Sequence, residues 1–80
     1  MRLPQNLDGK TLIRRLRPLG YEQTRQSGSH VRLTRTSEEG QQHVTVPLHK
    51  PLRVGTLNAI LAEVAGHLQI TKAELIQRVS

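Results

Sequence analysis

Histidine and arginine are the residues of this sequence whose side chains suit catalysis or ligand binding. The chain has four histidines and no cysteine, so it offers no thiol nucleophile and no cysteine ligand for zinc. An imidazole titrates near neutral pH and can therefore take up or release a proton under physiological conditions. A guanidinium group binds phosphate through paired hydrogen bonds. Histidine beside arginine is thus a combination suited to chemistry on a phosphate-containing ligand.

The overall charge also favours a polyanionic ligand. Twelve lysines and arginines against six acidic residues give a net charge of +6, and nucleic acid is the usual partner of such an excess. A charged surface that only keeps the protein in solution is the competing explanation. No segment approaches the roughly 18 apolar residues of a membrane span, and the N-terminus lacks the apolar stretch of a signal peptide. We therefore expect a cytoplasmic protein without a membrane partner.

The first half of the chain predicts one helix and three strands. After an irregular lead over residues 1–7, Asp8 is expected to cap a helix that Pro18 ends near Arg17. Alternation of polar and apolar residues, interrupted by turns, predicts the strands that follow. These strands cover residues 21–26, 29–35 and 43–46.

The second half predicts two more helices and completes the fold class. An amphipathic stripe indicates a helix over residues 54–65 that ends at Gly66, and the capping box formed by Thr71 and Glu74 opens a third helix. The order α-β-β-β-α-α predicts a single α+β domain over residues 1–80. We expect a two-layer sandwich in which the helices cover one face of a three-stranded antiparallel sheet.

Strand alternation assigns the side chains to two faces of this sheet. The apolar face under the helices is expected to contain Val31, Leu33, Val44 and Val46. The opposite face is expected to stay in water. It would carry His30, Arg32, Thr34, His43 and Thr45.

The turn between the first two strands decides which side chains meet. A two-residue turn at Ser27-Gly28 would place Arg25 opposite His30. The same register turns Tyr21 toward water, which a bulge near Gly28 or a strand that begins after Tyr21 would correct. The pairing of Arg25 with His30 therefore depends on where the turn lies.

The second hairpin extends this patch. When the apolar faces are matched, Leu33 lies against Val44 and His30 lies opposite Pro47, near the point where the chain leaves toward His49. We therefore expect a patch on the water-facing side of the sheet. Its members would be Arg25, His30, Arg32 and His49.

Several motifs together resemble one known family. They are Gly9-Lys10-Thr11-Leu12-Ile13-Arg14-Arg15-Leu16, Leu19-Gly20-Tyr21, Arg25-Gln26-x-Gly28-Ser29-His30, Val44-Thr45-Val46-Pro47-Leu48-His49 and Gly55-Thr56-Leu57-x-x-Ile60-Leu61. In this order and spacing the sequence resembles the HicA family over about residues 8–79. The most specific parts are Gly-Ser-His after the first strand and the Val-Pro-x-His block that precedes Gly-Thr-Leu.

The resemblance implies a fold and an activity. The fold is that of a double-stranded-RNA-binding domain, in agreement with the element order predicted from periodicity. The activity is that of a toxin that cleaves mRNA and is neutralised by a HicB-type antitoxin. The catalytic histidine of the family corresponds to His30, and no cofactor is implied.

The candidate site combines this histidine with its basic neighbours. His30 would act as general base or general acid, while Arg25 and Arg32 hold the phosphate, with Gly28 and Ser29 beside them. Gly28 serves the turn and leaves room for a phosphate to approach the backbone.

The other histidines are weaker candidates. His49 is either a second acid or base, or an ordinary loop residue. His43 and His67 are expected to be structural or incidental. No metal site is predicted, because no two histidines have a metal-binding helical spacing and Glu38-Glu39 lies in a turn without a converging ligand.

Two other classes of function fit the same residues. A non-catalytic RNA-binding module would use the same basic face without cutting, and its binding would weaken as salt rises. A protein-interaction module would bind an acidic partner and have no measurable affinity for RNA.

Overall fold

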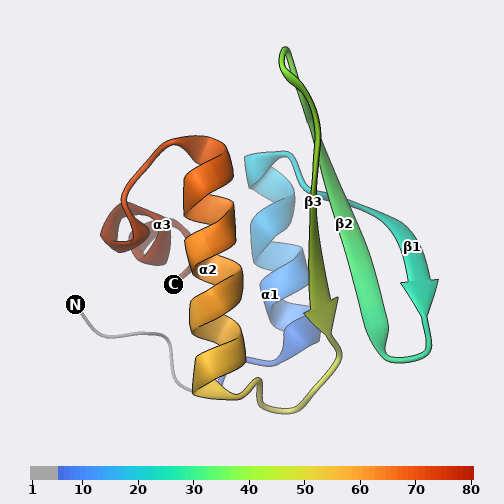
Figure 1. Cartoon of the computed structure of the whole chain (residues 1–80). Coiled ribbons are helices and arrows are strands. Elements are labelled where there is room, and N and C mark those ends of the chain that lie inside the picture. The colour runs from blue at the N-terminus through green and yellow to red at the C-terminus, as the bar shows by residue number, and fades with distance from the viewer. Residues whose placement is uncertain (1–5) are drawn as a thin grey trace.

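The helices and strands follow the predicted order α-β-β-β-α-α, with a short 3-10 turn added after the first helix (Figure 1). The computed structural model describes residues 6–80, so most of the predicted irregular lead over residues 1–7 lies outside the described part. The α+β fold class is confirmed. The elements are α1 (Gly9–Leu16), η1 (Arg17–Leu19), β1 (Glu22–Ser27), β2 (His30–Ser37), β3 (Gly40–Pro47), α2 (Val54–Leu68) and α3 (Lys72–Val79).

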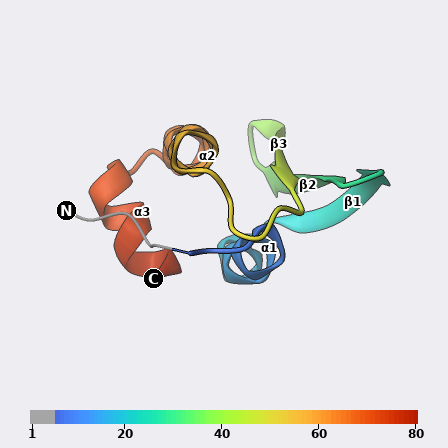
Figure 2. The same ribbon diagram turned by 90° about the horizontal axis from the view of Figure 1, so that it is seen from below.

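The sheet is antiparallel, has the strand order β1-β2-β3, and buries one face. Both α1 and α2 pack against β3, and α3 packs against α2 and α1. The strand residues predicted for the apolar face, Val31, Leu33, Val44 and Val46, are at most 3% exposed. Strand β1 lies at the end of the sheet far from α2 and α3 (Figure 2), and all six of its residues are exposed.

The first helix begins directly against the end of β3. Asp8 occupies the N-cap position as predicted, but its side chain makes no capping hydrogen bond. The Gly9 amide instead donates to the His49 carbonyl at 3.1 Å. A Cβ atom at residue 9 would overlap the Pro47 carbonyl oxygen, so only glycine allows this approach of the helix to the sheet.

The first helix ends where it was predicted to end. Pro18 lies in the first turn of η1, where its missing N–H costs no helical hydrogen bond. Gly20 closes the turn with a φ of 100°, in the left-handed region that favours glycine. The chain then enters the core at Tyr21, whose side chain is 1% exposed.

The pairing of β1 with β2 differs from the prediction. The turn is Gly28-Ser29 instead of Ser27-Gly28, so Ser27 pairs with His30 and Arg25 pairs with Arg32. The predicted pairing of Arg25 with His30 is therefore wrong. The physical reason is the turn type: a two-residue turn with φ +58° at its first position favours glycine there, so the turn begins at Gly28.

A bulge in β1 adjusts the rest of the register. The bulge lies between Gln23 and Arg25, so Thr24 is the extra residue and has no directly opposite residue on β2. Two alternatives were predicted to turn Tyr21 away from water. The first, a strand that begins after Tyr21, is confirmed, because β1 begins at Glu22. The second, a bulge near Gly28, is wrong, because the bulge lies at Thr24. With the bulge at Thr24, Tyr21 is buried and Thr24 and Arg25 both face the side of the sheet away from the helices.

The second hairpin and the last two helices are closer to expectation. β3 pairs with β2 as predicted, with Leu33 against Val44 and His30 against Pro47. The second helix continues beyond Gly66 to Leu68, because the apolar stripe extends through Leu68, which packs against the core. Thr71 caps α3 as predicted by accepting a hydrogen bond from the Glu74 amide at 3.1 Å.

Tyr21 links the sheet layer to the end of α2. Its hydroxyl lies 2.8 Å from Nδ1 of His67, and the two rings stack with their centroids 6.2 Å apart. Burial, partly offset by the positive charge of Arg35, raises the pKa of Tyr21 from 10.0 to about 12. The phenol therefore stays protonated at neutral pH and shares a hydrogen bond with Nδ1 of His67.

The contact at Gly9 gives a stability prediction with an internal control. Gly9→Ala is expected to lower the free energy of unfolding by about 3 kcal/mol, because the added methyl meets backbone that cannot move aside. Gly66→Ala is the matched control, since a Cβ at this exposed helical position meets nothing within 4 Å. It is expected to add about 0.5–1 kcal/mol through helix propensity. Urea unfolding of both variants measures the difference, and equal effects would contradict the close approach at Gly9.

Tyr21 is expected to make the fold sensitive to alkaline pH. Because its folded pKa of about 12 exceeds the ordinary value of 10.0, the unfolded chain loses the phenolic proton first. This contribution to stability is complete below pH 10.0 and is lost as the pH rises toward 12. The loss is expected to be about 2–3 kcal/mol in the wild type and absent in Tyr21→Phe.

The measurement is the free energy of unfolding of both proteins from neutral to strongly alkaline pH. Tyr21→Phe lacks the hydrogen bond to His67 at every pH and is therefore expected to differ from the wild type throughout. The comparison is for this reason between the two slopes of the free energy of unfolding against pH. Parallel slopes above pH 10.0 would contradict the raised pKa.

Candidate nucleic-acid interface on the open face of the sheet

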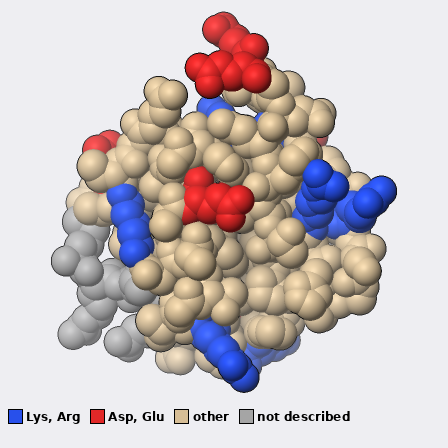
Figure 3. Space-filling view, in the orientation of Figure 1, with Lys and Arg blue, Asp and Glu red and all other residues tan. Residues whose placement is uncertain are grey.

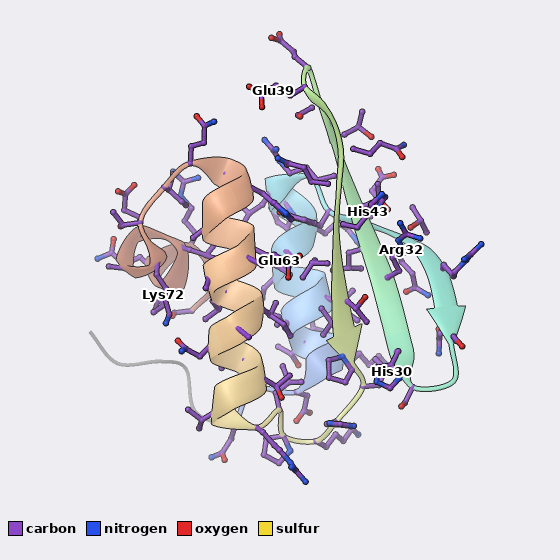
Figure 4. All side chains as sticks on the ribbon, viewed as in Figure 1. His30, Arg32, Glu39, His43, Glu63 and Lys72 are labelled. Atoms are coloured by element: carbon purple, nitrogen blue, oxygen red, sulfur yellow. The ribbon has the colours of Figure 1, made fainter. Side chains whose placement is uncertain are left out.

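His30 is exposed at one end of the sheet, on the face away from the helices, as predicted. It is the first residue of β2 and lies between Ser27 of β1 and Pro47 of β3. Figure 4 shows it near the turn that joins β1 to β2, with Arg32 farther along the same strand. The imidazole is therefore accessible to a ligand that lies across the open face of the sheet.

The turn before His30 is held in place by the loop that follows β3. The Leu48 amide donates to the Ser29 carbonyl at 2.7 Å, and Nε2 of Gln26 donates to the Gly28 carbonyl at 3.0 Å. Gly28 itself has φ +58°, and the space beside its Cα is open. These contacts fix the backbone around the Gly28-Ser29-His30 motif, so the approach to His30 has a defined shape.

Two arginines face each other next to this end of the sheet. Arg25 of β1 and Arg32 of β2 are cross-strand partners on the open face. Arg32 follows His30 by two residues, which places it about 7 Å farther along the strand. Arg25 does not pair with His30, but the two still share this face. In Figure 3 basic groups gather at the edge formed by β1 and β2, while acidic groups lie at the tip of the β2–β3 turn.

His49 lies in the loop after β3 and is exposed. It follows Pro47, the partner of His30, by two residues, and its carbonyl accepts the hydrogen bond from Gly9. Within residues 6–80 no hydrogen bond joins the side chains of His49 and His30. A catalytic role for His49 stays a prediction, as does its alternative role as an ordinary loop residue.

Thr34 is buried in a hydrogen-bonded cluster, although it lies on the face of the sheet that was predicted to stay in water. Thr34 is on the open face as predicted, yet only 7% exposed. Its Oγ1 lies 2.7 Å from Oγ1 of Thr24 and 2.9 Å from Nδ1 of His43. The bulge at Thr24 brings the second hydroxyl into this cluster. His43, expected to be incidental, is thus held in a fixed orientation, and only strand alternation had placed it on the same face as His30.

A second basic surface lies on the opposite side of β1. A groove of about 390 Å³ separates α1 from the β1–β2 hairpin. One wall carries Lys10, Arg14 and Arg17, and the floor is apolar. This groove adds positive charge near the sheet edge, which supports general attraction of a polyanion.

The element order and the sheet topology are consistent with the fold class of double-stranded-RNA-binding domains. The family model described as "HicA toxin of bacterial toxin-antitoxin" matches residues 9–66. The chain therefore belongs to the HicA toxin family of toxin–antitoxin systems, which implies a cognate antitoxin as its partner. No curated protein and no solved structure gives a significant match. Over the described residues, no helix is both long and apolar enough to cross a membrane.

The facing arginines are expected to reduce the stability of the free protein. Like charges directly opposite each other in a sheet are destabilising, and among the described residues neither guanidinium has a hydrogen bond or an acidic partner. Arg25→Gln is therefore expected to raise the free energy of unfolding by about 0.2–1 kcal/mol at low salt. Thermal or urea unfolding measures the gain, which should shrink in about 1 M salt. A loss of stability at low salt would show that the two charges do not repel each other.

Proposed function

We propose that this chain is a metal-independent endoribonuclease that cleaves mRNA, with His30 as its catalytic residue. The observation that carries the proposal is the exposure of His30 on the arginine-bearing face of the sheet in a chain of this toxin family. A ligand on this face reaches an imidazole and positive charge together. The described side chains can therefore supply both proton transfer and phosphate binding.

The proposed chemistry uses the nucleophile that RNA itself carries. The 2′-hydroxyl attacks the adjacent phosphorus, and the bond from phosphorus to the 5′-oxygen breaks. One group must remove the 2′-hydroxyl proton and another must protonate the leaving oxygen. His30 performs one of these transfers, and Arg25 and Arg32 hold the RNA backbone next to it through charge-assisted hydrogen bonds to phosphate. Gly28 and Ser29 shape the backbone against which the phosphate lies.

The identity of the second proton carrier defines two forms of the proposal. His49 is the candidate protein group, because it follows the strand partner of His30 by only two residues. Water would take this role if His49 is an ordinary loop residue. Cleavage needs two proton-transfer groups, and His30 is the one histidine among the paired residues at its end of the sheet. This favours a second candidate function, which is RNA binding without cleavage.

The proposal extends to the partner and the setting of the protein. A HicB-like antitoxin would neutralise the toxin, and mRNA in the cytoplasm would be its target. Residues 1–80 would act as one domain. Because the family implies an antitoxin, tests of activity require the chain free of that partner.

Loss of His30 is expected to abolish cleavage. His30→Ala should lower the rate by at least about 100-fold, the usual effect of removing a general acid or base. The assay follows a labelled RNA in the presence of a chelator, with the purified chain alone. Because His30 is exposed, the variant should unfold within about 0.5 kcal/mol of the wild type. His49→Ala in parallel distinguishes a second proton carrier, which loses activity, from a loop residue, which does not.

A second substrate tests the attacking group. RNA with one 2′-deoxy sugar at the cut should stay intact, and cleavage of that RNA would remove the proposed mechanism. Unchanged RNA with the wild type, together with binding that weakens as salt rises, would favour the non-catalytic alternative.

A further inference from the structure

A polar pocket lies on the open face of the sheet, away from His30. It has a volume of about 310 Å³ and takes side chains from all three strands. Every residue of its lining is polar or charged. The lining consists of Thr24, Arg25, Arg32, Thr34, Gln41 and His43.

A chain of hydrogen bonds orients the imidazole of His43 in this pocket. The Thr24 and Thr34 hydroxyls lie 2.7 Å apart, and the Thr34 hydroxyl lies 2.9 Å from Nδ1 of His43. The Thr24 hydroxyl also makes a long hydrogen bond of 3.5 Å to the Arg32 carbonyl. These contacts hold Nδ1 of His43 inside the cluster and leave Nε2 without a hydrogen-bond partner among the described residues.

The two arginines place two positive charges beside this imidazole. Arg25 and Arg32 face each other across the strands, and no acidic side chain belongs to the pocket lining. An anion between the guanidinium groups would remove their repulsion and accept charge-assisted hydrogen bonds. The bulge at Thr24 brings Thr24 and Arg25 to the same face and so helps to build this arrangement.

The pocket is separated from the end of the sheet where His30 lies. His43 pairs with Thr34, which is four residues along β2 from His30, a separation of about 13 Å along the strand. A proton-transfer group must approach within about 3 Å of the atom it serves. The imidazoles of His30 and His43 are therefore too far apart to serve the same phosphate group. Figure 4 shows this separation, with His43 and Arg32 near the middle of the sheet.

We propose that Arg25, Arg32 and His43 form a second subsite, which binds a phosphate of the RNA strand flanking the one that is cleaved. The subsite rests on the proposed ribonuclease function and deepens it, because it makes the substrate an RNA longer than a dinucleotide. The lining contains no apolar residue and carries two guanidinium groups, which bind phosphate through paired, charge-assisted hydrogen bonds. This favours a phosphate over a protein partner, whose interface centre is rich in apolar side chains.

The test scans the phosphates of a short single-stranded RNA. Each flanking phosphate in turn is replaced by a neutral methylphosphonate, and a 2′-deoxy sugar at the cut keeps the strand intact. At one position the replacement should weaken binding to the wild type about tenfold, as expected for loss of hydrogen bonds to a charged group. In His43→Gln the same replacement should have little effect, because the contact is already lost. Arg25→Gln is the second variant, since its exposed side chain makes no hydrogen bond that folding requires.

Lys72→Gln is the control for charge alone. This residue begins α3, far from the pocket (Figure 4), so its variant should keep the wild-type response at every phosphate. The salt dependence gives a further readout. The slope of log K against log salt should become shallower by about 0.7 in Arg25→Gln and stay less affected in Lys72→Gln.

The cleavage and binding results separate the two proposals. Failure to cleave would remove the nuclease but leave the methylphosphonate scan as a test of the subsite. Cleavage by the wild type with identical scans for the wild type, His43→Gln and Arg25→Gln would overturn the subsite alone. Tighter binding of polyglutamate than of the RNA, lost in His43→Gln, would assign the pocket to an acidic protein and also overturn it.

Discussion

The contact between the start of α1 and the backbone of Pro47 is the constraint on which the rest of the structure depends. It brings the helix so close to the end of β3 that residue 9 has no room for a side chain. Pro47 is also the strand partner of His30, and the next residue, Leu48, binds the turn at Ser29. The helix start, the loop after β3 and the end of the sheet at His30 therefore form one connected unit.

Periodicity alone was enough to predict the layers of the fold. Alternation in β2 and β3 correctly separated Val31 and Leu33 from His30 and Arg32, because one side of each strand is buried and the other is not. The second hairpin was also predicted in register, since only one alignment brings the apolar residues of both strands together. The predicted end of α2 at Gly66 was wrong. Gly66 is an exposed residue within the helix, which continues to Leu68, where the apolar stripe ends.

The site was less predictable because it depends on a turn and a bulge. β1 has no buried residue, so no apolar pattern fixes its alignment with β2. Its register follows instead from the left-handed backbone of Gly28 and from the extra residue at Thr24. That is why the predicted patch had the right face but the wrong neighbours, and why the cluster of Thr24, Thr34 and His43 could not be deduced.

The bulge in β1 has a consequence for the behaviour of the protein in a crowded solution. An edge strand presents a row of free backbone groups, and a flat edge of this kind recruits the edge of another molecule. β1 is such an edge, but its bulge bends the strand and its side chains are polar or charged. The bulge that helps to build the polar pocket on the open face thereby also makes this edge a poor template for fibre-like stacking.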